Sequence, residues 1–209
     1  MKREPGFLLV LTGPSGTGKT SLCRRITQQF PDVRFSVSYT TRQARVGEEH
    51  GRDYFFVDAE TFDRMAGEDA FAETAIVHGN RYGTSRRFLT EQVGEGKIIL
   101  LDIDPQGAHQ LKAQYPEAVF VFFIAPSFEE LRQRLVGRGT DSIETINRRL
   151  ARARSEVQEC TWYDYVIVND DFDRALSRFT SIIIAERCRT LRSGDTISSL
   201  LSRYGLEDQ

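Results

Sequence analysis

The segment LTGPSGTGKTS at residues 11–21 restricts the possible folds of this chain more than any other stretch. It matches the spacing G-x-x-x-x-G-K-[ST] through Gly13, Gly18, Lys19 and Thr20. Glycine offers no side chain for packing and loses the most conformational entropy on folding, so the three glycines indicate that a ligand approaches the main chain closely. The segment predicts a phosphate-binding loop whose N–H groups surround an anion.

The flanks of this loop have the patterns that such a site requires. An apolar run at residues 7–11 predicts a buried strand, and residues 21–26 begin a helical pattern. The helix N-terminus would add partial positive charge at the same point, where Lys19 would reach the β- and γ-phosphates of a nucleotide and Thr20 would bind Mg²⁺. The alternative is a plain glycine-rich turn, and the agreement of the motif with both flanks argues against it.

Length and charge exclude several classes of protein. A chain of 209 residues with 40% apolar and 28% charged residues suits one soluble domain, with or without insertions. The net charge of -2 argues against a general binder of nucleic acid or of membrane surfaces. No stretch approaches the roughly 18 apolar residues of a membrane span, and the N-terminal apolar run is too short for a signal peptide.

The cysteines indicate a reducing compartment. Cys23, Cys160 and Cys188 are odd in number, far apart and without a C-x-x-C pair, which argues against a disulfide framework or a structural zinc site. We expect reduced, packed cysteines in a cytoplasmic protein.

Short apolar runs alternate with helical patterns along most of the chain, as in β-α units around a parallel sheet covered on both faces. Beyond the first strand and helix, which should end near residues 30–31, the pattern predicts strands at residues 35–38, 98–101, 119–124 and 165–168 and helices at residues 106–113, 127–136, 142–159 and 172–188.

Residues 39–85 break this alternation. They contain shorter segments at residues 54–57 and 71–77 between glycine turn signals, which predict a small, largely antiparallel insertion with a second binding surface opposite the loop. The polar residues 190–209 form a short terminal helix or a frayed end.

A basic loop follows the second predicted strand, in SVSYTTRQARVGEEHGRDYFFV. Arg42, Arg45 and the hydroxyl of Tyr54 could bind a second phosphate, because a guanidinium group can donate two parallel hydrogen bonds to two phosphate oxygens. On composition alone a solvated basic loop is the simpler interpretation, and the nearby phosphate-binding motif favours a phosphate site.

Six segments together resemble the signature segments of guanylate kinases, in the same order and spacing, over roughly residues 6–187: GPSGTGKT, SVSYTTRQARVGEEHGRDYFFV, HGNRYGTS, LLDIDPQGA, RGTDSIETINRRL and YDYVIVNDD. The resemblance implies an α/β fold, with a P-loop kinase core whose parallel sheet is flanked by helices, a small, mainly antiparallel GMP-binding insertion and a helical lid. It implies a single domain with its core at residues 1–38 and 86–189, the insertion at 39–85, the lid at about 137–150 and a tail at 190–209.

The implied activity is ATP-dependent phosphorylation of GMP and dGMP to the diphosphates, with Mg²⁺, in purine nucleotide metabolism. Neither nucleic acid nor membrane is an implied partner, and the oligomeric state stays open. By resemblance the ATP site comprises Gly13, Pro14, Ser15, Gly16, Thr17, Gly18, Lys19, Thr20, Ser21, Arg134, Arg138 and Asn169. The implied catalytic residues are Lys19, Arg42, Arg138, Arg149 and Asp102, and Thr20 and Asp102 are the implied metal ligands.

The resemblance also assigns an acceptor site, comprising Ser38, Arg42, Arg45, Tyr54, Glu73, Tyr82, Thr84 and Asp104. Glu73 would accept from guanine N1–H and the 2-amino group, which adenine cannot donate, and the arginines and tyrosines would hold the GMP phosphate. Without the resemblance, Glu73 would be a solvent-facing strand residue and the tyrosines packing aromatics. Similarly, the lid arginines would be exposed helix residues paired with acidic neighbours.

Two other functions fit the same pattern of residues. A guanylate-kinase-like module could recognise phosphopeptides without catalysis, but such modules have damaged phosphate loops, whereas Gly13, Gly18, Lys19 and Thr20 are intact here. A P-loop kinase for another small phosphorylated molecule, such as a ribose phosphate, would not need Glu73 as a base-reading carboxylate.

Overall fold

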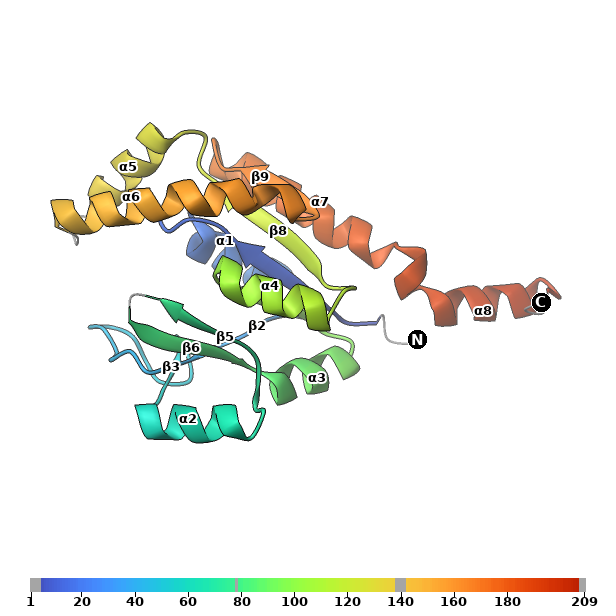
Figure 1. Cartoon of the computed structure of the whole chain (residues 1–209). Helices are drawn as coiled ribbons and strands as arrows, with labels where there is room; N and C mark the ends of the chain where they lie inside the picture. Colours follow the sequence, from blue (N-terminus) through green and yellow to red (C-terminus); the bar gives the residue numbers. More distant parts are fainter. Residues whose placement is uncertain (1–4, 78, 138–141, 207–209) are drawn as a thin grey trace.

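The computed structural model describes residues 5–77, 79–137 and 142–206. Its main sheet has five strands, all parallel, in the order β2-β7-β1-β8-β9 (Figure 1). These strands are β1 (Phe7–Thr12), β2 (Val33–Phe35), β7 (Ile98–Asp102), β8 (Val119–Ile124) and β9 (Tyr165–Val168). The predicted parallel sheet is therefore confirmed.

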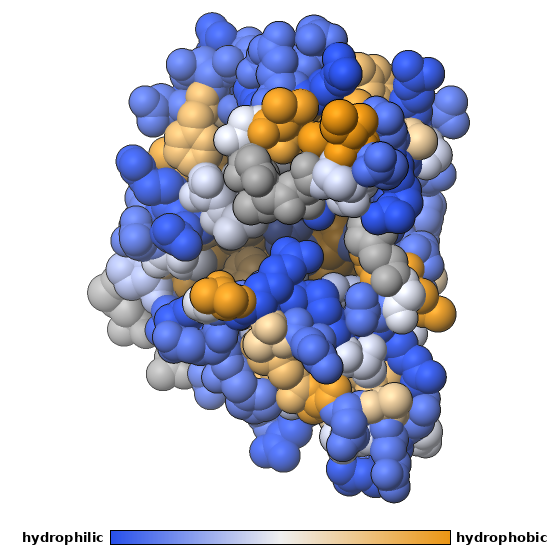
Figure 2. Space-filling model, turned by 90° about the vertical axis from the view of Figure 1, so that its left-hand side faces the viewer, coloured by the Kyte–Doolittle hydropathy of each residue, from blue (hydrophilic) through white to orange (hydrophobic). Residues whose placement is uncertain are grey.

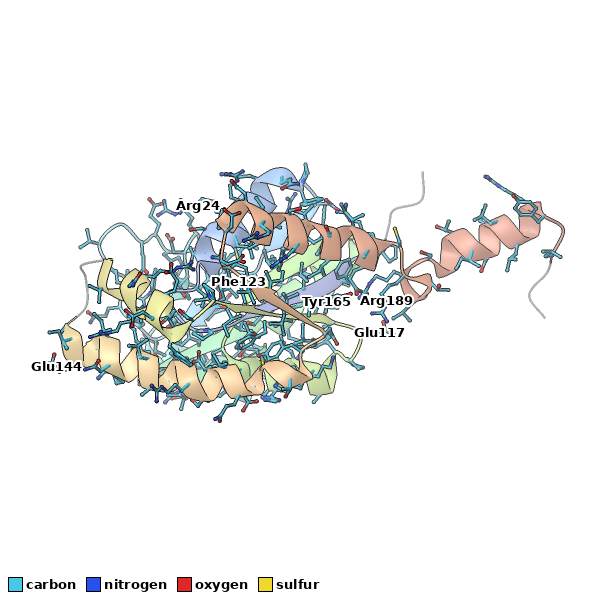
Figure 3. The ribbon with its side chains drawn as sticks, turned by 90° about the horizontal axis from the view of Figure 1, so that it is seen from above. Arg24, Glu117, Phe123, Glu144, Tyr165 and Arg189 are labelled. Carbon is cyan, nitrogen blue, oxygen red and sulfur yellow. The ribbon has the colours of Figure 1, made fainter. Side chains whose placement is uncertain are left out.

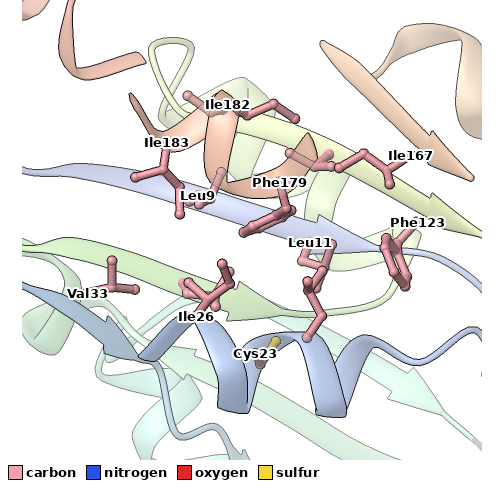
Figure 4. Packing of buried hydrophobic residues seen from close by; sticks show 14 of the residues in the cluster. Leu9, Leu11, Cys23, Ile26, Val33, Phe123, Ile167, Phe179, Ile182 and Ile183 are labelled. Atoms are coloured by element: carbon pink, nitrogen blue, oxygen red, sulfur yellow. The ribbon is translucent and has the colours of Figure 1, made fainter. Parts of the chain in front are cut away.

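Helices cover both faces of this sheet, which explains why its strands are apolar along almost their whole length. One face packs on α1 (Lys19–Gln29) and α7 (Phe172–Arg187), where Leu9 and Leu11 contact Ile26 and Phe179 (Figure 4). Alternate strand residues point to the opposite face, which packs on α3 (Arg86–Gly94) and α4 (Pro105–Gln114).

A second sheet lies beside the first, with the strand order β4-β3-β6-β5. Its strands are β3 (Tyr39–Thr40), β4 (Phe55–Phe56), β5 (Phe71–Val77) and β6 (Asn80–Ser85), and α2 (Ala59–Gly67) follows β4. The β3–β6 and β5–β6 pairs are antiparallel and the short β3–β4 pair is parallel. The small, mainly antiparallel sheet is confirmed, whereas neither α2 nor α3 was predicted.

Two helices project past one end of the main sheet. These are α5 (Phe128–Gly137) and α6 (Ile143–Gln158), which pack on each other through Leu131, Leu135 and Ile146 (Figure 1). The short 3₁₀ helix η1 (Glu159–Trp162) leads from α6 to β9. At the C-terminal end, η2 (Thr190–Arg192) precedes α8 (Gly194–Arg203), which extends away from the body of the protein.

The predicted elements of the main sheet coincide with the observed ones within about two residues, with one exception. The strand expected at residues 35–38 is wrong: β2 is Val33–Phe35, because Val33 is the buried residue that pairs with Ile98. Ser36 adds a last N–H bond to Leu100, after which the chain passes into the small sheet.

Three glutamines fasten the small sheet to the core. Gln106, Gln110 and Gln114 occur every fourth residue of α4, and their side-chain amides donate to the carbonyl oxygens of Ile76 (3.4 Å), Thr74 (2.6 Å) and Ala72 (2.8 Å) in β5. Gln110 also accepts from the N–H of Thr74. Four helical residues rise about 6 Å and two strand residues about 6.7 Å, so the two spacings match.

Among the described residues, no helix has the length and apolar character needed to cross a membrane.

Candidate active site

The loop between β1 and α1 adopts a backbone that requires glycine. Gly13, Gly16 and Gly18 have φ values of 146°, 92° and 104°, in the left-handed region that side chains disfavour. A Cβ atom at Gly13 would also lie 2.0 Å from the carbonyl oxygen of Phe123 in β8. Thr17 closes the loop by donating its hydroxyl to the carbonyl of Pro14, at 2.9 Å. The N-terminus of α1 opens directly from this loop, as an anion site requires.

The ammonium group of Lys19 lies inside the curve of this loop. It donates to the carbonyl oxygens of Gly13 (2.6 Å) and Pro14 (3.2 Å) and lies 3.8 Å from Oδ1 of Asp102 at the end of β7. Burial raises the pKa of the Asp102 carboxyl, and the Lys19 charge offsets only part of that rise. Lysine and aspartate thus meet at the carboxyl ends of neighbouring parallel strands.

Asn169 and Arg134 support the loop from behind. The buried amide of Asn169 donates to the carbonyl of Thr17 at 2.7 Å, and Arg134 of α5 donates to the carbonyl of Asn169 at 2.9 Å. Both residues were predicted to bind ATP. The structure places them next to the loop and connects the loop to α5.

Arg42 lies in an aromatic setting on the small sheet's side of the molecule. Its guanidinium carbon is 5.2 Å from the ring centre of Tyr54, which in turn packs edge-on against Tyr82 at 5.8 Å. Glu48 accepts from Arg42 at 2.9 Å and from the backbone N–H of Arg45 at 2.8 Å. The hydrogen bond that Glu48 accepts raises the pKa of Arg42 above its ordinary value. Sequence reasoning missed Glu48, although its spacing from the arginines was visible.

The arginine cluster and the phosphate loop face a common space. Burial raises the pKa of Tyr54 to about 12, and the charge of Asp102, which ends β7 beside the loop, adds to this rise. The face of the molecule shown in Figure 2 is hollowed between the part formed by α5 and α6 and the part formed by the small sheet. We therefore treat the arginine cluster and the loop as two parts of one candidate site.

A buried carboxyl lies deeper in the small sheet. Glu73 is 3% exposed, and its Oε1 accepts from the hydroxyl of Thr84, its cross-strand partner, at 2.6 Å. A β-bulge between Phe71 and Glu73 shifts the strand register, so that Ala72 and Glu73 are both buried. Burial raises the pKa of Glu73 to about 7. Ser38, the third predicted base-reading residue, is half-buried just before β3.

Asp104 accepts more hydrogen bonds within the protein than its sequence context predicts. It caps α4 by accepting from the N–H of Gly107 at 3.1 Å, while its second oxygen accepts from Gln106 and from Arg152 of α6, each at 3.0 Å. Sequence reasoning missed Arg152, which lies three residues after the predicted Arg149 on the same helix.

The remaining predicted residues differ in exposure. Thr20 and Ser21 are exposed on the first turn of α1, Arg45 is exposed, and Arg149 is half-buried on α6. Arg138 lies outside the described residues. Within the part of the chain that the structure describes, no three acidic, histidine or cysteine side chains form a metal-binding group.

Comparisons with known proteins agree with this arrangement. The guanylate kinase family profile matches residues 6–186. A guanylate kinase from Geobacter sulfurreducens is 55% identical over 202 residues, which cover 97% of this chain and 99% of that protein. Another from Syntrophotalea carbinolica is 57% identical over 192 residues, covering 92% and 91% of the two chains. The crystal structure of guanylate kinase from Anaplasma phagocytophilum superposes with a TM-score of 0.80 at 38% identity and covers 98% of both chains.

Proposed function

The chain belongs to the guanylate kinase family, and we propose that it transfers the γ-phosphoryl group of ATP to GMP and to dGMP. The observation that carries the proposal is the buried Glu73–Thr84 pair. Burying a carboxyl group costs free energy unless hydrogen-bond donors compensate for it, and a bound guanine base would supply such donors. This pair lies in the small sheet, while an intact phosphate loop lies in the core.

Guanine suits the Glu73 carboxylate. Its N1–H and 2-amino group are adjacent donors that one carboxylate can accept together, whereas adenine presents a lone pair at N1 and no amino group. A site built on such polar matching rejects the wrong base by roughly 10⁴-fold. The base and the phosphate supply these contacts, so the 2′-hydroxyl of the sugar is not needed and dGMP should also be accepted.

The acceptor phosphate would bind at Arg42, with Arg45, Tyr54 and Tyr82 around it. Glu48 now holds Arg42, and a phosphate would compete with it for the same guanidinium N–H groups. In this role Glu48 keeps the arginine oriented in the absence of substrate.

Transfer would proceed directly between the two nucleotides, without a covalent intermediate. The migrating phosphoryl group spreads negative charge over its oxygens, and Lys19, Arg42 and Arg149 would stabilise that charge. In this proposal the segment at about 137–150 forms a lid over a core at residues 1–38 and 86–189, with the acceptor insertion at 39–85. Lid closure would exclude water and bring the lid arginines to the phosphates.

A Mg²⁺ ion fits the available donors. The Thr20 hydroxyl on the first turn of α1 and the Asp102 carboxyl beside Lys19 are hard oxygen ligands, and Mg²⁺ typically keeps several waters and takes only one or two protein ligands. When bound, the ion would neutralise charge on the ATP phosphates. We place this activity in cytoplasmic purine nucleotide metabolism, in keeping with the free cysteines among the described residues.

Coupled measurement of ADP release with GMP, dGMP, AMP, CMP and UMP as acceptors tests the proposal. Turnover should be confined to GMP and dGMP, and absence of turnover with GMP would overturn it. The variant Glu73→Gln, which places an NH₂ donor opposite a guanine donor, should lower kcat/KM for GMP by about ten- to a hundredfold. The same variant should lower kcat/KM less for IMP, which lacks the 2-amino group.

A further inference from the structure

The first turn of α4 contacts the base-reading carboxyl through a glycine. A methyl group at Gly107 would lie 2.2 Å from Oε2 of Glu73 and 2.9 Å from its Cδ, closer than atoms can approach. Gly107 is itself buried. The carboxyl of Glu73 thus fills the space that a side chain at position 107 would occupy.

Backbone conformation does not explain this glycine. Gly107 lies in a regular helix and has no left-handed φ, and alanine is more favourable than glycine in a helix interior. The three heavy atoms nearest to such a methyl group all belong to the side chain of Glu73. The glycine is therefore required for space.

Hydrogen bonds hold α4 and β5 together around this contact. Gln110 bonds both the N–H and the carbonyl of Thr74, the residue next to Glu73, and Gln106 bonds Ile76. Asp104 fixes the N–H of Gly107 itself. Since the backbones are fastened on both sides of the contact, a methyl group would displace the end of the Glu73 side chain.

From these contacts we infer that Gly107 is a specificity-determining position, because its missing side chain leaves the space in which the Glu73 carboxylate is held to accept from guanine. This inference rests on the proposed function. Gly107 is a positioning residue: it acts through the carboxylate and determines how well the enzyme distinguishes GMP from purine nucleotides that lack the 2-amino group.

The variant Gly107→Ala tests the inference, with Gly94→Ala as a matched control. Gly94 is also a helical glycine, at the end of α3, and a methyl group there meets nothing within 4 Å. Gly107→Ala should keep its thermal unfolding midpoint but lose about ten- to a hundredfold in kcat/KM for GMP, with KM for ATP unchanged within about twofold. The GMP-to-IMP ratio of kcat/KM should fall toward one, and Gly94→Ala should keep the parent ratio.

A shorter carboxyl side chain at position 73 should compensate for the methyl group of Gly107→Ala. Glu73→Asp withdraws the carboxyl from position 107, so adding Gly107→Ala in that background should cost less than about twofold in kcat/KM for GMP. If Gly107→Ala fails to fold, the double variant should restore folding, and an unfolded double variant would overturn the inference.

The two proposals fail differently. A parent protein that does not phosphorylate GMP overturns the proposed function before any variant is compared. An active parent whose Gly107→Ala variant keeps both the rate with GMP and the GMP-to-IMP ratio overturns the inference alone. Equal additional losses from Gly107→Ala in the parent and the Glu73→Asp backgrounds would also overturn it.

Discussion

Nη2 of Arg152 lies 3.0 Å from Oδ2 of Asp104, so that α6 is joined to the capping residue of α4. The two residues are 48 positions apart in sequence. Glu156, one turn further along α6, accepts from Nε of the same arginine at 2.6 Å and holds it in place. Because α6 also carries Arg149, a displacement of this helix would act on both Arg149 and the turn that packs against Glu73.

Arg152→Ala should therefore weaken acceptor binding. Removing a partly buried, charge-assisted hydrogen bond costs about 1 kcal/mol or more, which corresponds to a rise of about fivefold or more in KM for GMP. Steady-state kinetics with GMP as the varied substrate measure this. Arg154→Ala is the matched control, since Arg154 lies on the same helix but stacks over Phe128. Equal effects of the two variants would mean that the bond to Asp104 has no role in acceptor binding.

Lys19→Ala should remove most turnover while leaving the fold intact. The lysine donates to two backbone carbonyls of its own loop and pairs with Asp102, so few packing contacts are lost. Losing the positive charge that would face the transferring phosphoryl group costs about 10²-fold or more in kcat. Lys112→Ala, at a surface ion pair with Asp164, serves as the control. A folded Lys19→Ala variant with the parent rate would contradict the proposed role.

Arg42→Ala should weaken GMP binding far more than ATP binding, because Arg42 packs against Tyr54 on the small sheet's side, whereas the phosphate loop lies between β1 and α1 of the core. The loss of a bidentate, charge-assisted contact should raise the dissociation constant for GMP by at least about tenfold. Titration calorimetry with each nucleotide separates the two effects. Arg52→Ala provides a control, since Arg52 is exposed and pairs with Glu49 and Asp53. Comparable losses for ATP and GMP would show that the two sites are wrongly assigned.

The sequence was sufficient for the parallel core and the phosphate loop. Strands buried on both faces carry continuous apolar runs, and the glycines of the loop occupy backbone conformations that only glycine adopts easily. Short elements were harder to predict, because the two-residue strands β3 and β4 are too short to show a hydrophobic periodicity.

The surroundings of Glu73 could not be predicted from the chain alone. A carboxylate on a half-buried strand usually faces solvent, whereas Glu73 lies on the buried face of β5 with Ala75. The residue types of β5 do not show that α4 covers this face at Gly107. Asp104 was expected near the acceptor, but its bond to Arg152 could not be foreseen, because the packing of α6 brings that arginine near. Contacts between elements distant in sequence decided both cases.

A buried ion pair makes the start of the C-terminal segment part of the fold. Arg192 is 8% exposed, donates to Glu186 at 3.2 Å and to the carbonyl of Glu117 at 2.9 Å, and lies over the ring of Phe7. Figure 3 shows Glu117, Tyr165 and Arg189 at the end of the molecule where the chain leaves for α8.

Arg192→Ala should lower the free energy of unfolding by about 2–3 kcal/mol, since it leaves a buried carboxylate with fewer partners. Urea titration measures this change. Arg189→Ala, which removes a 53% exposed side chain from the same carboxylate, should cost less than about 1 kcal/mol. A smaller loss for Arg192→Ala than for Arg189→Ala would contradict this account of the C-terminal segment.

The raised pKa of Glu73 predicts that GMP binding depends on pH near neutrality. Burial is the main cause of the rise to about 7, the nearby charge of Asp104 adds to it, and the hydrogen bond from Thr84 opposes it. Guanine requires the carboxylate form, so GMP affinity should fall as the pH drops below about 7, and binding near pH 6 should release a proton. The phosphate of GMP titrates near pH 6 as well, and comparison with Glu73→Gln, which keeps only that titration, isolates the carboxyl.

The same shift affects stability with the opposite sign. A carboxyl whose folded pKa lies above its unfolded value of 4.5 binds more protons in the folded state, so its contribution is fully present below about pH 4.5 and is lost as the pH rises through about 7. The unfolding free energy of the parent relative to Glu73→Gln should therefore decrease between about pH 4.5 and about pH 7, while GMP affinity increases over the upper part of that range. Calorimetric titration with GMP in buffers of different ionisation enthalpy, paired with urea unfolding at each pH, measures both. Parallel pH profiles for the parent and Glu73→Gln in either measurement would show that Glu73 is already ionised in the free protein.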